Sequence, residues 1–269
     1  MEKETILELI NIAHKFKSVY SRLQVYRYLK IKMTLPQFNQ IVNDLIKEKL
    51  VFERDNFLYT EDMIESGLQK MSWSRSIFAR YRKYLALITK IPWIKYIGMT
   101  GANAFETCNE IDDIDLLIIT SRRRLWLTRL LIMRVGKLLG KRHIVDANYF
   151  IDEDNLKFYQ EGYFVAVQVM SMVSVMNPNF KNKLLEANTW IYKYLPNAEI
   201  EDDNPFYIIK ETCKDKKPLM PKSLDRLNTK IFEKYKVYLR EKFPDEVGGN
   251  LILSEGVAKL HTYNHQKLY

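Results

Sequence analysis

The chain has 269 residues, 47% of them hydrophobic and 28% charged, and 42 Lys/Arg against 33 Asp/Glu give a formal net charge of +9 at pH 7. This composition excludes disordered, collagen-like and low-complexity proteins, and the length predicts about two domains. The basic balance indicates nucleic acid, nucleotide phosphates or an acidic surface as classes of partner.

The two cysteines, Cys108 and Cys213, are too few for a disulfide framework and show no metal-ligand spacing with the four histidines. We therefore expect a reducing, cytoplasmic compartment. The N-terminus has no apolar signal core, and the longest apolar-leaning run, 164–176, is shorter than the ~20 residues a membrane-spanning helix needs. We expect no membrane contact.

The first 60 residues predict three short helices. Segments 5–16 and 19–29 carry apolar residues at helical spacing. The third helix has a marked start, because Thr34 can cap it, Pro36 falls in its first turn, and Gln37 stands where a capping box requires it. We expect this helix to present one apolar stripe along its length.

After these helices, 50–59 alternates as a strand, a turn at Asp55-Asn56 and a second strand. Three helices followed by a small hairpin predict a winged-helix-like module over residues 1–64. The first 60 residues hold ten basic and seven acidic side chains, a small surplus for a DNA-binding module. We therefore favour a protein-contact or domain-packing role, and DNA binding remains the alternative.

The rest of the chain predicts a mixed core and a helical end. A long basic helix over 61–91 ends before Pro92, and alternating strands and helices follow. The expected elements are a strand over 93–99, a strand over 113–120, a helix over 122–139 capped by Ser121, and a strand over 143–151. From Gly162 the pattern is mostly helical. We place domain boundaries at 65–160 for the core, with its leading linker helix, and 161–269 for a C-terminal helical region.

The most informative stretch is 96–120, in which an apolar strand leads to a turn at Gly101 and a second apolar strand follows Asp113. Residues i and i+2 of a strand point to one face, so the carboxylates of Asp113 and Asp115 are expected to converge. Mg²⁺ binds such pairs together with water and phosphate oxygens. The pattern predicts a metal site; the alternative is a solvated turn before a buried strand.

This stretch resembles the nucleotidyltransferase superfamily of DNA polymerase beta, whose signature is Gly-Ser followed, after about ten residues, by two alternating acidic residues. Here Asp113 comes 12 residues after Gly101. Segments 124–129 and 186–190 are similar to an uncharacterised bacterial and archaeal branch that has a winged-helix-like N-terminal region. The resemblance covers most of residues 1–200. It implies an α+β fold with a polymerase beta-like mixed-sheet core, two Mg²⁺ (or Mn²⁺) ions and an NTP substrate.

The family pattern has Ser where this chain has Ala102. The backbone amides of Thr100, Gly101 and Ala102 can still surround an anion, but the hydroxyl is missing. A hydrogen bond to a charged group contributes roughly 1.5–3 kcal/mol, so weaker nucleotide use is expected. Asn103 is the candidate substitute for the missing side chain.

The resemblance also implies a third carboxylate on the neighbouring strand. Asp146 is the favoured candidate, as metal ligand and as general base on the acceptor, and Asp152 is its competitor. We interpret Asp112 as a surface acid. The Arg122–Arg124 run is either a solvated cluster or a phosphate contact.

Together these features predict an enzyme that moves a nucleoside monophosphate from an NTP to an unknown hydroxyl acceptor, which is a small molecule, RNA or a protein, and releases pyrophosphate. Two alternatives remain. The chain is a degenerate relative that binds nucleotide or a partner without catalysis, or it is a winged-helix DNA-binding regulator.

Overall fold

A computed structural model describes residues 1–140, 145–199, 203–212, 221–245 and 251–260. Several features of the sequence lie outside the described residues: the first two residues of the strand expected over 143–151, Cys213, the Gly248-Gly249 pair and the histidines at 261 and 265. The same holds for the side chain of Asp146, whose backbone is described. No helix in the described part of the chain is both long and apolar enough to cross a membrane.

The N-terminal part contains three helices and a three-stranded antiparallel sheet with the strand order β1-β3-β2. In chain order the elements are α1 (Glu2–Lys15), β1 (Tyr20–Ser21), α2 (Arg22–Tyr28), α3 (Leu35–Lys47), β2 (Phe52–Arg54) and β3 (Phe57–Tyr59). The three predicted helices and the hairpin are all present. The strand β1, which the sequence did not predict, pairs with β3 and ties the start of α2 to the hairpin.

Local side-chain bonds set the bounds of these elements. The capping box predicted at Thr34 is present, with the Gln37 amide donating to the Thr34 hydroxyl and the Gln37 side chain accepting from the Thr34 amide. Ser21 and Gln24 form the same arrangement at α2. Asp55 and Asn56 both have positive φ, as a two-residue hairpin turn requires.

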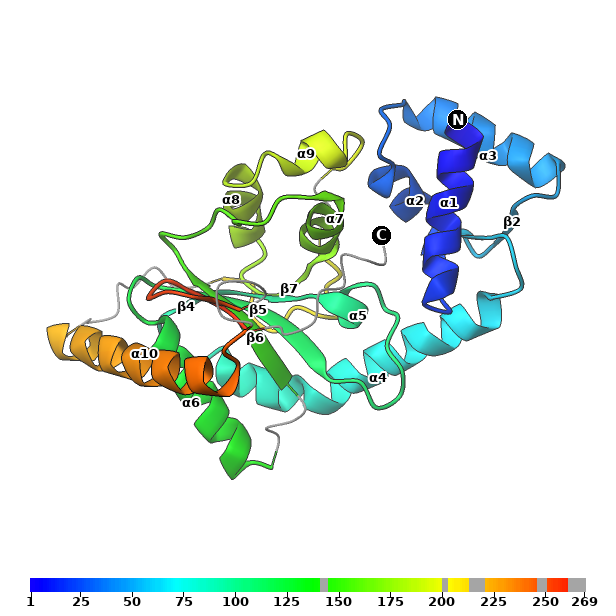
Figure 1. Cartoon of the computed structure of the whole chain (residues 1–269). Helices are drawn as coiled ribbons and strands as arrows, with labels where there is room; N and C mark the ends of the chain where they lie inside the picture. Colours follow the sequence, from blue (N-terminus) through cyan, green and yellow to red (C-terminus); the bar gives the residue numbers. More distant parts are fainter. Residues whose placement is uncertain (141–144, 200–202, 213–220, 246–250, 261–269) are drawn as a thin grey trace.

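A single long helix, α4 (Ile64–Ile88), leads from this module to the larger part of the chain. It ends four residues before Pro92, in agreement with the predicted stop. In Figure 1 the helix extends from beneath the N-terminal helices to beneath the central sheet. Its later turns bury Ile77, Phe78 and Leu85 against that sheet.

The larger part is built on a mixed six-stranded sheet with the order β7-β4-β5-β6-β9-β8, which gives the chain a mixed α/β architecture consistent with the α+β class. The pair β5/β6 is parallel and the other pairs are antiparallel. The strands are β4 (Ile94–Met99), β5 (Ile114–Thr120), β6 (Val145–Asp152), β7 (Val173–Met176), β8 (Ile252–Leu253) and β9 (Val257–Lys259).

Helices cover both faces of the sheet (Figure 1). The sheet has a hydrophobic core on each face, and alternate residues of β5 point into one core or the other. Leu116 and Ile118 pack in the first core, with α4, α6 and α10. Leu117 and Ile119 pack in the second core, with α7, α8 and α9. The N-terminal module joins the second core. The helices not yet given are α5 (Gly101–Ala104), α6 (Leu125–Leu138), α7 (Tyr163–Ser171), α8 (Phe180–Glu186), α9 (Ile191–Tyr194) and α10 (Lys222–Lys242).

In its described part, the region from Gly162 is mostly helical, as expected, but it also contains strands that the sequence did not predict, and the expected cap of α6 was wrong. Three strands lie in the region expected to be mostly helical, and they complete both edges of the sheet: β7 pairs with β4, and β9 pairs with β6 and β8. Ser121 does not cap α6, which begins at Leu125. Instead, the Asn228 side-chain oxygen accepts hydrogen bonds from the backbone amides of Trp126 (3.0 Å) and Leu127 (3.1 Å). The cap therefore comes from α10.

Candidate functional site

The turn at Gly101 joins the end of β4 to the start of β5. Gly101 has φ +60°, a left-handed conformation that glycine adopts without strain. The Thr100 amide donates to the Asp115 carbonyl oxygen at 3.0 Å, which holds the turn beside the first residues of β5. The short helix α5 begins at Gly101.

The Asp115 carboxylate lies against the Cα atom of Gly101. A methyl group added at Gly101 would come 2.5 Å from Asp115 Oδ2, so no larger residue fits here without a shift. Ile114 and Leu116 pack into one core, so the strand pleat directs Asp115 towards the opposite face. Asp113 lies immediately before β5, and both acidic residues are half-buried.

The two candidates for the third carboxylate lie at opposite ends of β6. The Asp146 backbone pairs with that of Asp115, whereas Asp152 pairs with Thr120 at the far end of β5. The Asp152 carboxylate is buried and accepts hydrogen bonds from the Asn155 side chain (2.6 Å) and the Asp154 amide (3.2 Å). Burial raises its pKa, and these hydrogen bonds oppose the rise. Asp152 therefore closes a local turn.

A glutamine that sequence reasoning did not select reaches the Gly101 turn from α7. The Gln168 side-chain oxygen accepts a hydrogen bond from the Gly101 amide at 3.2 Å. This amide belongs to the turn expected to surround phosphate. The one available signal was a polar side chain within an apolar helix, since α7 otherwise buries Ala166, Val167, Val169 and Met170.

The two residues after Gly101 have different environments. Ala102 is half-buried and packs against the core that contains α4 and α6. Asn103 is buried, and its side-chain nitrogen donates to the Asp113 carbonyl oxygen at 2.7 Å. Its side-chain oxygen is buried and accepts no hydrogen bond from the described residues. Asn103 therefore holds the backbone of Asp113 in place.

The loop between α5 and β5 is held by α4 and by Tyr207. Glu106, at φ +53°, accepts hydrogen bonds from Arg75 (3.0 and 3.3 Å) and from the Tyr207 hydroxyl (2.6 Å). The Glu106 carboxylate raises the pKa of Arg75, and burial raises that of Tyr207. Lys70, which is buried, donates to the Thr107 carbonyl oxygen at 3.1 Å. These contacts fix the loop that leads to Asp113.

The nearby Asp112 has a local role, because its carboxylate accepts a hydrogen bond from the backbone amide of Asn109 at 2.8 Å.

The arginines at the start of α6 pair with carboxylates. Arg122 lies 3.0 Å from Asp154, and Arg124, which is 1% exposed, lies 2.5 Å from Asp225. Arg123 lies 3.9 Å from the same Asp225. Arg122 and Arg123 are exposed, as in the solvated cluster, whereas Arg124 is buried and fits neither of the two interpretations.

The structure thus places the Asp115 carboxylate beside the Gly101 turn at one end of the sheet, with the Asp113 backbone held by Asn103 and the Asp146 backbone next to that of Asp115. Within the described residues, no three His, Cys, Asp or Glu side chains form a group that could hold a metal ion. The side chain of Asp146 is not among the described residues. No family model matches the chain, and neither a curated protein nor a solved structure does.

Proposed function

We propose that the chain is a metal-dependent nucleotidyltransferase that transfers a nucleoside monophosphate from an NTP to a hydroxyl acceptor. The observation that carries the proposal is the contact between Gly101 and Asp115, which places an acidic side chain against the turn that we expect to bind phosphate. The order β4-β5-β6, with Asp115 and Asp146 paired at the starts of β5 and β6, supports it, as does the polymerase beta-like core we infer from the sequence.

Asp113, Asp115 and Asp146 are the residues that would hold Mg²⁺ or Mn²⁺. Oxygen ligands of this kind suit these ions, and the glycine at 101 leaves room beside the turn for the Asp115 carboxylate, which a Cβ atom would approach to 2.5 Å. When bound, such ions neutralise charge on the triphosphate and stabilise the attacking and leaving oxygens.

The protein groups then have distinct tasks. The backbone amide of Ala102 and, once the Gln168 oxygen leaves it, that of Gly101 bind phosphate oxygens and orient the leaving pyrophosphate, whereas the Thr100 amide keeps its bond to the Asp115 carbonyl oxygen and holds the turn. Asn103, through the Asp113 carbonyl, keeps the first carboxylate in position. Asp146 accepts the proton of the acceptor hydroxyl as general base. The acceptor is a small molecule, RNA or a protein, and the N-terminal module, which we infer to be winged-helix-like, positions it or a partner.

The test is incubation of the purified chain with each α-labelled NTP, Mg²⁺ or Mn²⁺ and candidate acceptors. We expect labelled product from the wild type and at least about a hundredfold less from Asp113→Asn and Asp115→Asn, because each variant loses a ligand charge. Asp112→Asn is the matched control and should retain activity. Equal transfer by all four proteins would refute the metal assignment.

A second function, nucleotide binding without transfer, is favoured by two observations. Ala102 lacks the hydroxyl of the serine in the family pattern, and the Gln168 side-chain oxygen already accepts the hydrogen bond that the Gly101 amide can donate. Calorimetric titration with each NTP distinguishes this function from catalysis. Binding that does not depend on metal, with no labelled product under any condition, would establish the non-catalytic function.

A further inference from the structure

The outer face of α10 carries an unusual row of positive charge. The helix contains seven Lys/Arg and three Asp/Glu within its 21 residues. Four of the basic side chains stand four residues apart and are exposed: Lys222, Arg226, Lys230 and Lys234. These four residues form the α10 basic row. Residues four apart are neighbours on a helix surface, so the row forms one continuous stripe.

The acidic residues of α10 do little to neutralise this stripe. Asp225 is 2.5 Å from the buried Arg124, and Glu233 is 3.7 Å from Lys236. Glu241 lies near the C-terminal end, beyond the row. In the part of the chain that the structure describes, no member of the α10 basic row has a carboxylate within ion-pair distance.

Like charges four residues apart repel and destabilise a helix. The row contains three such pairs, from 222 to 226, 226 to 230 and 230 to 234. The row also extends about 18 Å, from a rise of about 1.5 Å per residue. That length corresponds to about five nucleotide steps at about 3.4 Å each. Phosphates bound along the row would offset this repulsion, because each negative phosphate attracts the basic side chains next to it.

We propose that the α10 basic row is a binding surface for the phosphate backbone of a nucleic acid. A membrane is the less suitable anionic partner, because the apolar side of α10 is already used. Asn228, Phe232 and Leu239 are buried, and Phe232 packs on the Trp126 ring at 5.3 Å. A helix that lies in a bilayer surface needs that apolar side free.

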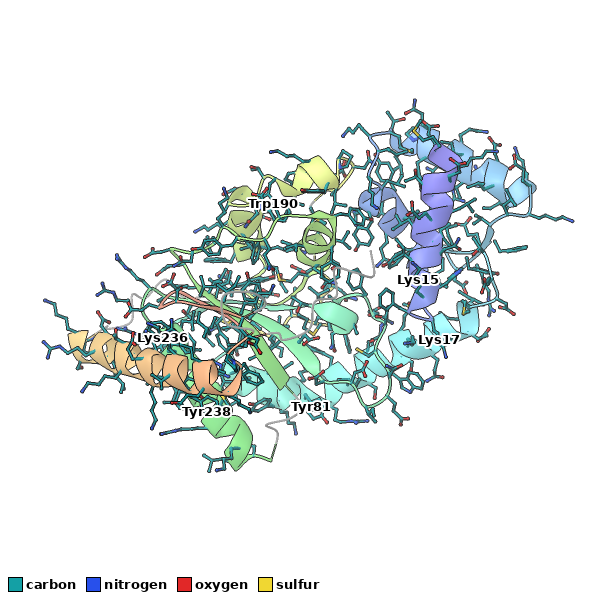
Figure 2. All side chains as sticks on the ribbon, viewed as in Figure 1. Lys15, Lys17, Tyr81, Trp190, Lys236 and Tyr238 are labelled. Carbon is teal, nitrogen blue, oxygen red and sulfur yellow. The ribbon has the colours of Figure 1, made fainter. Side chains whose placement is uncertain are left out.

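The position of α10 separates this surface from the N-terminal module. Figure 1 shows α10 on the outside of the molecule beside α6, at the opposite end from α1, α2 and α3. Figure 2 shows Lys236 and Tyr238 on α10 far from Lys15 and Lys17 of the N-terminal module. The two candidate nucleic-acid surfaces can therefore be tested independently.

The experiment measures fluorescence anisotropy of labelled 20-mers, as single-stranded RNA, duplex RNA and duplex DNA, titrated with the full chain from 50 to 200 mM salt without NTP or metal. The test variant carries Lys222→Gln, Arg226→Gln, Lys230→Gln and Lys234→Gln. The matched control carries Lys15→Gln, Lys17→Gln, Lys47→Gln and Lys49→Gln, four exposed residues of the N-terminal module, and has the same net charge. Circular dichroism and thermal unfolding show that both variants fold.

We expect the wild type and the control to bind at least one of the three nucleic acids. The test variant should bind that nucleic acid about tenfold or more weakly at 100 mM salt, with a salt slope smaller by about three units, because each phosphate contact contributes roughly 0.7–0.9 to the slope. Loss of binding in the control alone would assign binding to the N-terminal module and overturn the proposal. No wild-type binding to nucleic acid, or binding only to vesicles containing phosphatidylserine, would also overturn it. None of these outcomes depends on nucleotidyl transfer.

Discussion

Gly101 and Asp115 are in direct contact. The Asp115 carboxylate lies against the Cα atom of Gly101, and a methyl group at Gly101 would approach Asp115 Oδ2 to 2.5 Å. The contact joins residues that are 14 positions apart in the sequence and belong to different elements, α5 and β5. Glycine is therefore needed at position 101 for two reasons: the turn has a positive φ, and the Asp115 carboxylate takes the place of a side chain.

The first prediction concerns this contact. Gly101→Ala should destabilise the fold by more than the roughly 1–2 kcal/mol that a left-handed alanine costs, and it should abolish nucleotide binding because Asp115 must move. Gly140→Ala is the matched control, since Gly140 has φ +66° and would place its methyl group in open space. Urea unfolding and NTP titration measure both effects. Equal behaviour of the two variants would contradict the role of the contact.

The second prediction restores the family hydroxyl. Ala102→Ser should strengthen NTP binding by about tenfold, because a hydrogen bond to a charged phosphate contributes roughly 1.5 kcal/mol or more. Ala104→Ser, in the same short helix but buried at its far end, is the control and should leave affinity unchanged. Calorimetric titration gives the dissociation constants. If Ala102→Ser binds no better than the wild type, the turn does not contact phosphate in the family manner.

The third prediction tests the cap that α10 provides to α6. Asn228→Ala should lower the free energy of unfolding by about 2 kcal/mol, because two backbone amides in the first turn of α6 lose their acceptor in a buried site. Ser223→Ala, on the exposed side of α10, should change it by less than about 0.5 kcal/mol. Urea denaturation of the three proteins is sufficient. A small effect at Asn228 would mean that water replaces the side chain.

The fourth prediction concerns pH. Burial lowers the pKa of His14, an effect that Glu61 opposes, and the ring lies 3.2 Å from the Thr60 hydroxyl. Because the folded pKa is below the unfolded value of about 6.5, the neutral ring stabilises the fold above that pH, and this contribution is lost as the pH falls through the folded pKa.

The measurement compares the wild type with His14→Gln in urea at pH 7.5, 6.5 and 5.5. The stability difference between them should shrink as the pH falls. The other three histidines are present in both proteins, so their titration cancels. A difference that stays constant with pH would show that His14 does not titrate in this range.

The parts of the fold that the sequence predicted correctly depend on local signals. The Thr34 capping box, the Asp55-Asn56 turn, the end of α4 and the strands on either side of Gly101 each follow from residues a few positions apart. The contact between the Gly101 turn and the Asp115 carboxylate could also be predicted from local signals, because an apolar strand, the glycine and a second apolar strand follow one another in the sequence.

The features that the sequence did not reveal depend on distant partners. β7, β8 and β9 have four, two and three residues, too few for a period, and they are strands because β4 and β6 offer open hydrogen-bonding edges. The start of α6 is set by Asn228, about a hundred residues further along the chain. Gln168, Glu106 and Tyr207 approach the Gly101 turn or its loop only after the chain has folded.

The edge formed by β9 also determines where the chain can be shortened. Tyr149, Phe150 and Ile151 of β6 pair with residues 257–259, so a fragment that ends at residue 245 would leave the backbone of β6 without its neighbour. An open, apolar strand edge pairs with other chains. Such a fragment should self-associate in size-exclusion chromatography, whereas a chain that keeps residues up to 260 should not do so through this edge.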